Sequence, residues 1–202
     1  MYEADKAFQE KNITKAIKLY KKSARGGEDE ALFKLGKIYY NGRFIKRDIS
    51  KAMGYFKQVA SYGHKKAKFN VAVIYGQKKY KNHSYKKSYE IFLDLAREHH
   101  PKAQFMVANA LLKGLGTQKD YPLALKWLEQ SYFKNGYEPS RCMLAVVYAN
   151  GLGVIQNLGR ARVLAQNGFD KKTPICTRVY KEFNLHKYES DKSFKFGFYR
   201  DL

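Results

Sequence analysis

Small and apolar residues recur along the chain at a fixed interval and with the spacing of α-helices. Each copy of the pattern follows a residue whose side chain can cap a helix start, and these residues are Asn12, Asp48, Ser84, Asp120 and Asn157. The intervals between them are 36, 36, 36 and 37 residues. The sequence therefore predicts a structural repeat in which one helix starts at each cap.

The predicted helices share one apolar face. A small residue stands four positions after each cap, and a bulky pair usually stands seven and eight positions after it, as in Tyr55 and Phe56. A second helical pattern precedes each loop, with Ala31, Leu35 and Tyr39 among its members in the second copy. Each repeat is thus a helix A, a loop that usually contains glycine, and a helix B. Such a pair cannot bury its apolar face alone, so the pattern predicts an all-α solenoid of antiparallel helix pairs.

The loop GLGTQKD, residues 114–120, raises the alternative of a phosphate-binding site. A Walker-type loop needs Gly-Lys-Ser/Thr at a helix start, and this loop lacks it. Related text recurs around Gly42 and around Gly151 and Gly153, again without that signature. We therefore interpret the glycines as left-handed residues that end helix A rather than as a site of chemistry.

The repeats resemble the Sel1-like repeats, a bacterial family of helix pairs related to tetratricopeptide repeats. The second copy carries the family pattern at Ala31, Phe33, Leu35, Gly36, Tyr39, Gly42, Asp48, Lys51, Ala52, Phe56, Ala60 and Gly63. The fourth and fifth copies keep the loop glycines, and the resemblance covers about residues 3–168. The third copy departs from the pattern, because Lys78 and Tyr80 replace the loop glycines and Ser88 replaces the alanine.

The resemblance implies a right-handed α-solenoid of about five repeats with a period of 36 residues. We expect the solenoid to span 1–170, with units at about 1–27, 28–63, 64–99, 100–136 and 137–170. Residues 171–202 would form a C-terminal segment, with a helix that starts near Thr173 and has Pro174 in its first turn. In the final basic tail, Phe194, Phe196 and Phe198 alternate with other residues. This tail could cover the last repeat or dock on a partner.

The net charge of +21 favours an anionic partner: an acidic protein, nucleic acid or an acidic membrane surface. The charge comes mostly from 30 lysines, with 9 arginines. Sequence-reading and bidentate phosphate sites favour arginine, so a solvated lysine coat is an equally good interpretation. No run of 18 apolar residues occurs, which predicts that no segment spans a membrane.

The sequence shows no arrangement of residues for catalysis. Its five histidines make no i, i+4 pair and have no carboxylate cluster at ligand spacing, so we expect no metal site, no cofactor and no enzyme activity. The two cysteines, Cys142 and Cys176, lack metal spacing. They are buried thiols if the protein is cytoplasmic, or the one intramolecular disulfide that the chain can form if it is exported.

Partner binding is expected on the inner face of the array, which in related helix-pair repeats is lined mainly by helix A. Phe33, Phe69 and Phe105 match the family's packing pattern and are interpreted as core. The candidates for the inner face are the variable positions of helix A, namely Lys34, Lys37, Tyr40, Asn70, Val73, Met106, Asn109, Leu112, Arg141 and Val146. A second candidate is a basic loop with Lys78, Lys79, Lys81, Lys86 and Lys87, which alternates with tyrosines. It could hold single-stranded nucleic acid or be a solvated loop.

The resemblance implies a non-enzymatic protein-binding solenoid, and the positive charge indicates that its protein partner is acidic. The most specific hypothesis is an immunity protein that neutralises a secreted antibacterial effector, such as a lipase of the type VI secretion system. The alternatives are an adaptor in bacterial secretion or envelope processes, and a basic binder of nucleic acid or an anionic surface. The polar N-terminus shows no secretory signal. A removed leader would look the same, so the predicted compartment is periplasmic if a leader was removed and otherwise cytoplasmic.

Overall fold

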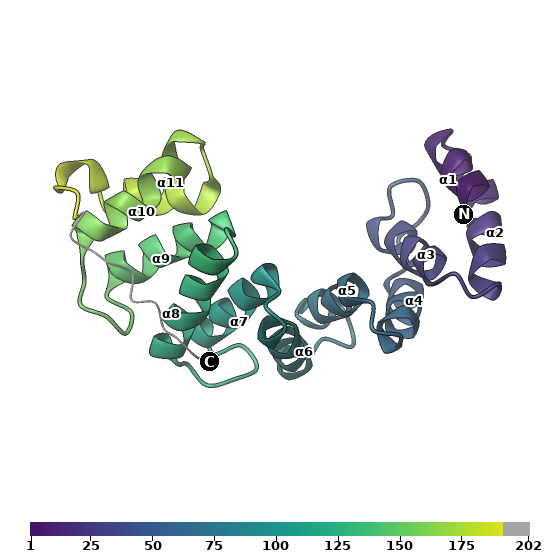
Figure 1. The fold of residues 1–202 in the computed structure, drawn as a ribbon, viewed down its shortest axis with the longest axis horizontal. Helices are drawn as coiled ribbons and strands as arrows, with labels where there is room; N and C mark the ends of the chain where they lie inside the picture. The colour runs from purple at the N-terminus through teal and green to yellow at the C-terminus, as the bar shows by residue number, and fades with distance from the viewer. Residues whose placement is uncertain (192–202) are drawn as a thin grey trace. The chain divides into compact units, whose positions relative to one another are not determined.

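A computed structural model describes residues 1–191, and these form a succession of helices without a strand (Figure 1). The chain divides into two compact units, Met1–Ile91 and Phe92–Leu202, and the division falls inside α6. Among the described residues, no helix is long and apolar enough to cross a membrane. In chain order the helices are α1 (Tyr2–Gln9), α2 (Ile13–Arg25), α3 (Asp29–Asn41), α4 (Ile49–Ser61), α5 (Lys65–Tyr75), α6 (Tyr85–Arg97), α7 (Pro101–Lys113), α8 (Tyr121–Glu129), α9 (Glu138–Asn150), α10 (Leu158–Asp170) and α11 (Pro174–Glu182), with a π-helical turn η1 (Gln130–Lys134) and a 3-10 turn η2 (Leu185–Lys187).

The five predicted helix caps are confirmed. In each B helix the cap side chain accepts a hydrogen bond from the backbone N–H three residues later, at Lys15, Lys51, Lys87, Leu123 and Arg160. These bonds satisfy an N–H group that the helix itself leaves without a partner. The sequence signal and the helix start coincide because capping is a local interaction.

A second hydrogen bond recurs in the loops between helix A and helix B. The backbone N–H of the cap residue donates to a carbonyl near the end of helix A, as from Asp48 to Tyr39 at 3.0 Å and from Asn157 to Tyr148 at 3.0 Å. Gly42, Gly114 and Gly151 end their A helices in the left-handed conformation, as the sequence predicts. The GLGTQKD loop is therefore a joint between helices.

The third repeat closes its loop with the same hydrogen bond, although Lys78 and Tyr80 stand where the fourth repeat has Gly114 and Gly116. The Ser84 N–H donates to the Tyr75 carbonyl at 2.8 Å. Ser88, which stands where the other repeats have alanine, is buried and donates its hydroxyl to the Ala72 carbonyl at 2.8 Å. A hydroxyl in this contact would be costly without a partner, and the Ala72 carbonyl supplies one.

Neighbouring helices in the first unit pack along the chain, with α1 on α2, α2 on α3, α3 on α4 and α4 on α5. One buried cluster joins α1, α2 and α3 around Ala7, Ala16 and Leu35, and a second continues through Phe56 and Val71. Burial of these apolar faces is the main stabilising term.

The second unit contains a buried polar junction beside η1. Gln104 is fully buried, and its side-chain amide donates to the Ala96 carbonyl and to Gln130, each at 3.3 Å. Ser140 donates to Ser131 at 2.7 Å, and Ser131 donates to the Pro101 carbonyl at 2.8 Å. These hydrogen bonds offset the cost of burying polar side chains between α7 and α9.

The C-terminal helix α11 starts where the sequence predicts it. Its N-cap residue is Thr173, 36 positions after Tyr137, the N-cap residue of α9, so α11 begins in register with the A helices. Cys176 on α11 and Cys142 on α9 form a disulfide, with their Cα atoms 4.8 Å apart and both side chains buried. Gly168 of α10 lies against this bond: a Cβ atom there would be 2.7 Å from the Cys176 Cβ and 3.1 Å from the Cys142 Sγ.

The chain after α11 folds back onto the start of α10. Asp191 accepts a hydrogen bond from the Asn157 side chain at 2.7 Å and lies 3.6 Å from the Arg160 guanidinium. Gly159 makes room for this contact, because a Cβ there would be 2.5 Å from the Glu189 carbonyl oxygen. The alternating phenylalanines of the tail, Phe194, Phe196 and Phe198, lie outside the described residues.

We expect Gly168→Ala to lower the free energy of unfolding by about 1–3 kcal/mol, because the added methyl group overlaps the disulfide. Urea denaturation followed by circular dichroism measures the change.

Gly54→Ala is the matched control. Gly54 is exposed in α4, and a Cβ there meets nothing within 4 Å. Alanine should stabilise this helix by about 0.5–1 kcal/mol. An equal response of the two variants would contradict a close contact at Gly168.

Candidate functional site

The first unit contains an open cavity of about 670 Å³ formed by α1, α2, α3 and the loop after α3. Its lining combines the apolar side chains of Phe8, Ile38 and Phe44 with charged side chains. The complete lining is Asp5, Phe8, Gln9, Lys11, Tyr20, Lys34, Lys37, Ile38, Asn41, Arg43 and Phe44. Four of these residues are cationic and one is a carboxylate, so the cavity has a positive balance.

Three polar residues in the lining of the cavity form a hydrogen-bonded cluster. The Asp5 carboxylate accepts a hydrogen bond from the Tyr20 hydroxyl at 2.6 Å and another from the Lys34 ammonium at 2.6 Å. Burial raises the pKa of Asp5, but the hydrogen bonds from Lys34 and Tyr20 outweigh it, so the pKa lies below its usual value. Burial and the bond to Asp5 raise the pKa of Tyr20. Asp5 is therefore ionised and Tyr20 neutral at neutral pH, and Lys34 is held in place.

Two other cations of the cavity, Lys37 and Arg43, lie against aromatic rings. The Arg43 guanidinium lies 5.1 Å from the centre of the Phe44 ring, which in turn contacts Phe8 edge-on at 5.9 Å. The Lys37 ammonium lies 5.7 Å from the Phe33 ring. Such contacts attract a cation to a ring face and restrict its motion. Lys37, Arg43 and Phe44 are nevertheless exposed and accessible to a partner.

The remaining inner-face candidates of the first unit do not line this cavity. Tyr40 is half-buried, accepts a hydrogen bond from the Gln77 side chain at 3.2 Å and packs edge-on against Phe56. Asn70 and Val73 are half-buried on α5. The structure thus brings together Lys34 and Lys37 of the predicted set.

In the second unit the candidates are less accessible than the sequence suggests. Met106, Asn109 and Leu112 are half-buried along α7, and Val146 is half-buried on α9. Arg141 is only 8% exposed, forms an ion pair with Glu138 at 2.9 Å and lies over the Tyr132 ring. Arg141 therefore does not belong to an open binding surface in this structure, because its guanidinium is held against its own helix and a neighbouring ring.

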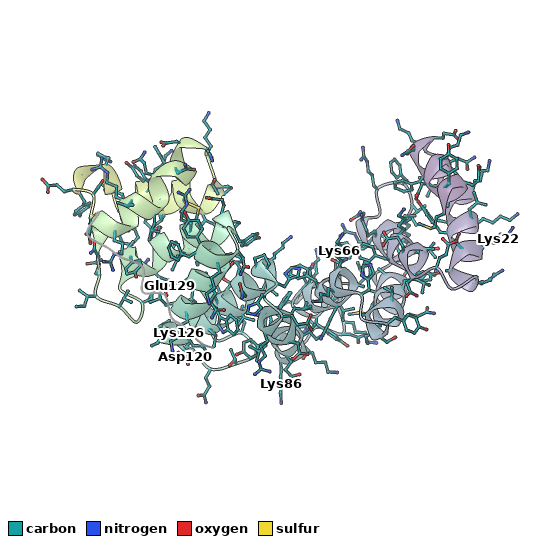
Figure 2. All side chains as sticks on the ribbon, viewed as in Figure 1. Lys22, Lys66, Lys86, Asp120, Lys126 and Glu129 are labelled. Carbon is teal, nitrogen blue, oxygen red and sulfur yellow. A yellow bond between two sulfur atoms is a disulfide. The ribbon has the colours of Figure 1, made fainter. Side chains whose placement is uncertain are left out.

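All five lysines of the predicted basic loop are exposed, namely Lys78, Lys79, Lys81, Lys86 and Lys87. Lys86 is labelled in Figure 2. The loop does not contribute to the cavity of the first repeats.

Several cavity residues could not be found from the repeat pattern. Phe8, Arg43 and Phe44 are not among the apolar helix positions that define the repeat, and Phe8 of α1 meets Phe44 of the loop after α3 only in the folded protein. The available signal was local: Phe44 stands where the family pattern has the second loop glycine, and Arg43 occupies the variable position between Gly42 and Phe44.

Other chemically active side chains have structural roles. His64 and His100 cap α5 and α7, where each ring Nδ1 accepts a backbone hydrogen bond. Within residues 1–191, no group of three or more His, Cys, Asp or Glu side chains is placed to hold a metal ion.

Glu129, labelled in Figure 2, is 8% exposed at the end of α8, and its Oε2 atom has no hydrogen-bond partner. Burial raises the pKa of Glu129 to about 7, against the opposing effect of Arg160.

Fold and surface together define a helical-repeat solenoid with a recessed, positively charged surface in its first repeats. The Sel1 repeat model matches residues 1–28, 29–64, 101–132 and 139–167, which is more than half of the chain. The chain belongs to the Sel1 repeat family, whose repeats generally mediate protein–protein interactions.

Solved structures show the same fold. A Sel1 repeat protein from Oxalobacter formigenes has a TM-score of 0.78 at 20% identity, over 94% of this chain and 78% of that one. A protective antigen present in uropathogenic Escherichia coli strains, which displays an SLR fold, has a TM-score of 0.75 at 25% identity over 87% of this chain. This chain spans 38% of the length of that antigen. No protein with a curated description matches the chain.

We expect the stability of the protein to fall as the pH rises from 5 to 8 through the ionisation of Glu129. The folded protein holds this proton more tightly than the unfolded chain, so the stabilising effect is complete at low pH and is lost as the pH passes about 7. Glu129→Gln mimics the neutral form, and its free energy of unfolding relative to the natural protein should rise by about 1–3 kcal/mol between pH 5 and pH 8. Urea denaturation at the two pH values measures this difference.

Glu182→Gln on α11 is the control, because Glu182 is exposed. The same relative stability of Glu129→Gln at both pH values would show that Glu129 does not titrate between them.

Proposed function

We propose that this protein is a non-catalytic binding solenoid that recognises an acidic segment of a partner protein through the cavity of its first two repeats. The observation that carries the proposal is the lining of that cavity, which combines Lys11, Lys34, Lys37 and Arg43 with apolar side chains. One carboxylate, Asp5, lies among them and is paired with Lys34 at 2.6 Å. Lys11, Lys37 and Arg43 provide the positive charge that would meet the partner.

The geometry of these cations supports binding with a small entropic cost. Arg43 and Lys37 lie against Phe44 and Phe33, so part of their motion is already restricted before a partner arrives. Phe8, Ile38 and Phe44 offer an apolar surface between the charges. An acidic segment that also carries an apolar side chain would complement both features.

The biological role that we propose is neutralisation of a secreted antibacterial effector, for example a type VI secretion lipase. Two facts support it: membership of a repeat family that mediates protein contacts, and a net charge of +21. A strong positive field accelerates encounter with an acidic protein, and rapid capture is what an inhibitor of a toxic enzyme needs. An adaptor role in secretion or envelope processes is the alternative and would use the same surface.

The genomic neighbourhood supplies the test of this role. Where an adjacent gene encodes a secreted effector, its purified product should form a stoichiometric complex with this protein. Co-expression should also protect cells from that effector. Absence of both the complex and the protection would reject the immunity role.

A charge reversal tests the surface. We expect Lys37→Glu to slow association with an acidic partner about tenfold while it changes dissociation less, because a cation at the edge of an interface acts mainly on encounter. Biolayer interferometry with the partner immobilised measures both rates. Lys37 suits this purpose better than Lys34, whose replacement would leave Asp5 beside a second carboxylate.

Lys18→Glu is the matched control, since Lys18 is exposed on α2 and does not line the cavity. If both variants slow association equally, the effect comes from net charge, and the cavity is not the binding site.

A further inference from the structure

A long segment of the chain carries lysine without any acidic residue. Between Asp48 and Glu90 there are 10 lysines, no arginine and no Asp or Glu, which gives residues 49–89 a net charge of +10. About half of the total of +21 thus lies in 41 of the 202 residues. Most of this segment lies in 65–100, between the second and third segments that match the Sel1 repeat model. The repeat that departs from the family pattern is therefore also the repeat richest in lysine.

The fold gathers six of these lysines around the third loop. The third-loop patch comprises Lys57, Lys78, Lys79, Lys81, Lys86 and Lys87, all of them exposed. Lys57 of α4 and Lys87 of α6 both lie against the ring of Tyr75, at 5.4 Å and 5.7 Å from its centre. The loop that carries the next three lysines is closed by the hydrogen bond from Ser84 to Tyr75. Cations from two helices and one loop thus surround the end of α5.

Two tyrosine rings hold this patch in place. Tyr75 and Tyr80 pack against the buried cluster of the first unit, and the Lys79 ammonium lies 5.2 Å from the centre of the Tyr80 ring. The rings therefore serve as supports for lysines and not as free platforms. A nucleic-acid base could stack on either ring only by displacing a cation from it.

We propose that the third-loop patch binds the phosphate backbone of nucleic acid, without reading its sequence. The patch offers closely spaced ammonium groups, and a nucleic acid offers closely spaced phosphates whose counterions are released on binding. Lysine is a point charge and lacks the fork by which arginine recognises base edges. Because the tyrosine rings are occupied, duplex and single strand bind with similar affinity.

The same surface fits a membrane less well. Stable membrane attachment by a basic patch needs a second, apolar signal. The structure describes all of residues 49–89, and the large apolar side chain exposed among them is Tyr62. Tyr62 lies between α4 and α5, at the N-terminal end of α5, whereas the third loop follows the C-terminal end of α5. The third-loop patch also shares no residue with the lining of the cavity, so this proposal does not depend on the proposed function.

Fluorescence anisotropy with a labelled 20-base-pair duplex of arbitrary sequence tests the proposal. The affinity should fall steeply between 50 mM and 200 mM salt, with a slope in log K against log salt of roughly −4 to −5 for about five phosphate contacts. Removing three loop charges in K78A/K79A/K81A should lower the affinity at 100 mM salt at least tenfold and reduce the slope by about 2–3. A single strand of 20 nucleotides should bind within about threefold of the duplex.

The triple variant K18A/K21A/K22A is the matched control, because it removes the same charge from exposed positions of α2. Its affinity should remain within about threefold of the natural protein, and circular dichroism should show both triple variants folded. Equal losses in the two triple variants would reject a localised site. The proposal also fails if the duplex does not bind at 50 mM salt, if the single strand is strongly preferred, or if vesicles with phosphatidylserine bind while the duplex does not compete.

Discussion

The structure depends on one close approach in each repeat, where a small residue of helix B lets helix A pack against it. The residues at this position are Ala16, Ala52, Ser88, Ala124 and Ala161, and each is at most 6% exposed. A larger side chain would separate the helices and expose the apolar rows on both sides of the contact. In the second to fifth repeats the N–H of the cap residue donates to the carbonyl nine residues earlier, so helix B starts at the same point relative to the end of helix A in each of them. Because each pair is stabilised by its neighbours, these local contacts propagate along the array.

This arrangement leaves the loops and the outer helix positions free to vary. In the first unit two loops use that freedom differently. The loop after α3 presents Arg43 and Phe44 to a cavity, whereas the loop after α5 presents lysines around Tyr75 and Tyr80. The repeat supplies the geometry in both cases, and the chemistry comes from residues that the repeat does not specify. Function in such an array therefore has to be sought where the period is broken.

The sequence predicted the local features of the fold well. The five caps, the left-handed glycines and the start of α11 depend on interactions within a few residues, which a pattern in the sequence records directly. Only part of the cavity lining could be predicted from the sequence. Lys34 and Lys37 followed from their positions on helix A, but their neighbours Phe8 and Phe44 are 36 residues apart and meet through packing. The burial of Arg141 could not be predicted either, because the sequence beside a core position does not indicate whether a guanidinium group reaches solvent.

The cavity and the third-loop patch both lie in the first unit and are connected through packed side chains. Tyr40 of α3 contacts Phe56 of α4 and accepts a hydrogen bond from Gln77 of the third loop. Phe56 is fully buried, so a change at one surface would have to repack this ring before it reached the other. Electrostatic coupling between the two positive surfaces is screened at physiological salt over a Debye length of about 8 Å. The two positive surfaces should thus bind their partners independently, unless one partner is large enough to cover both.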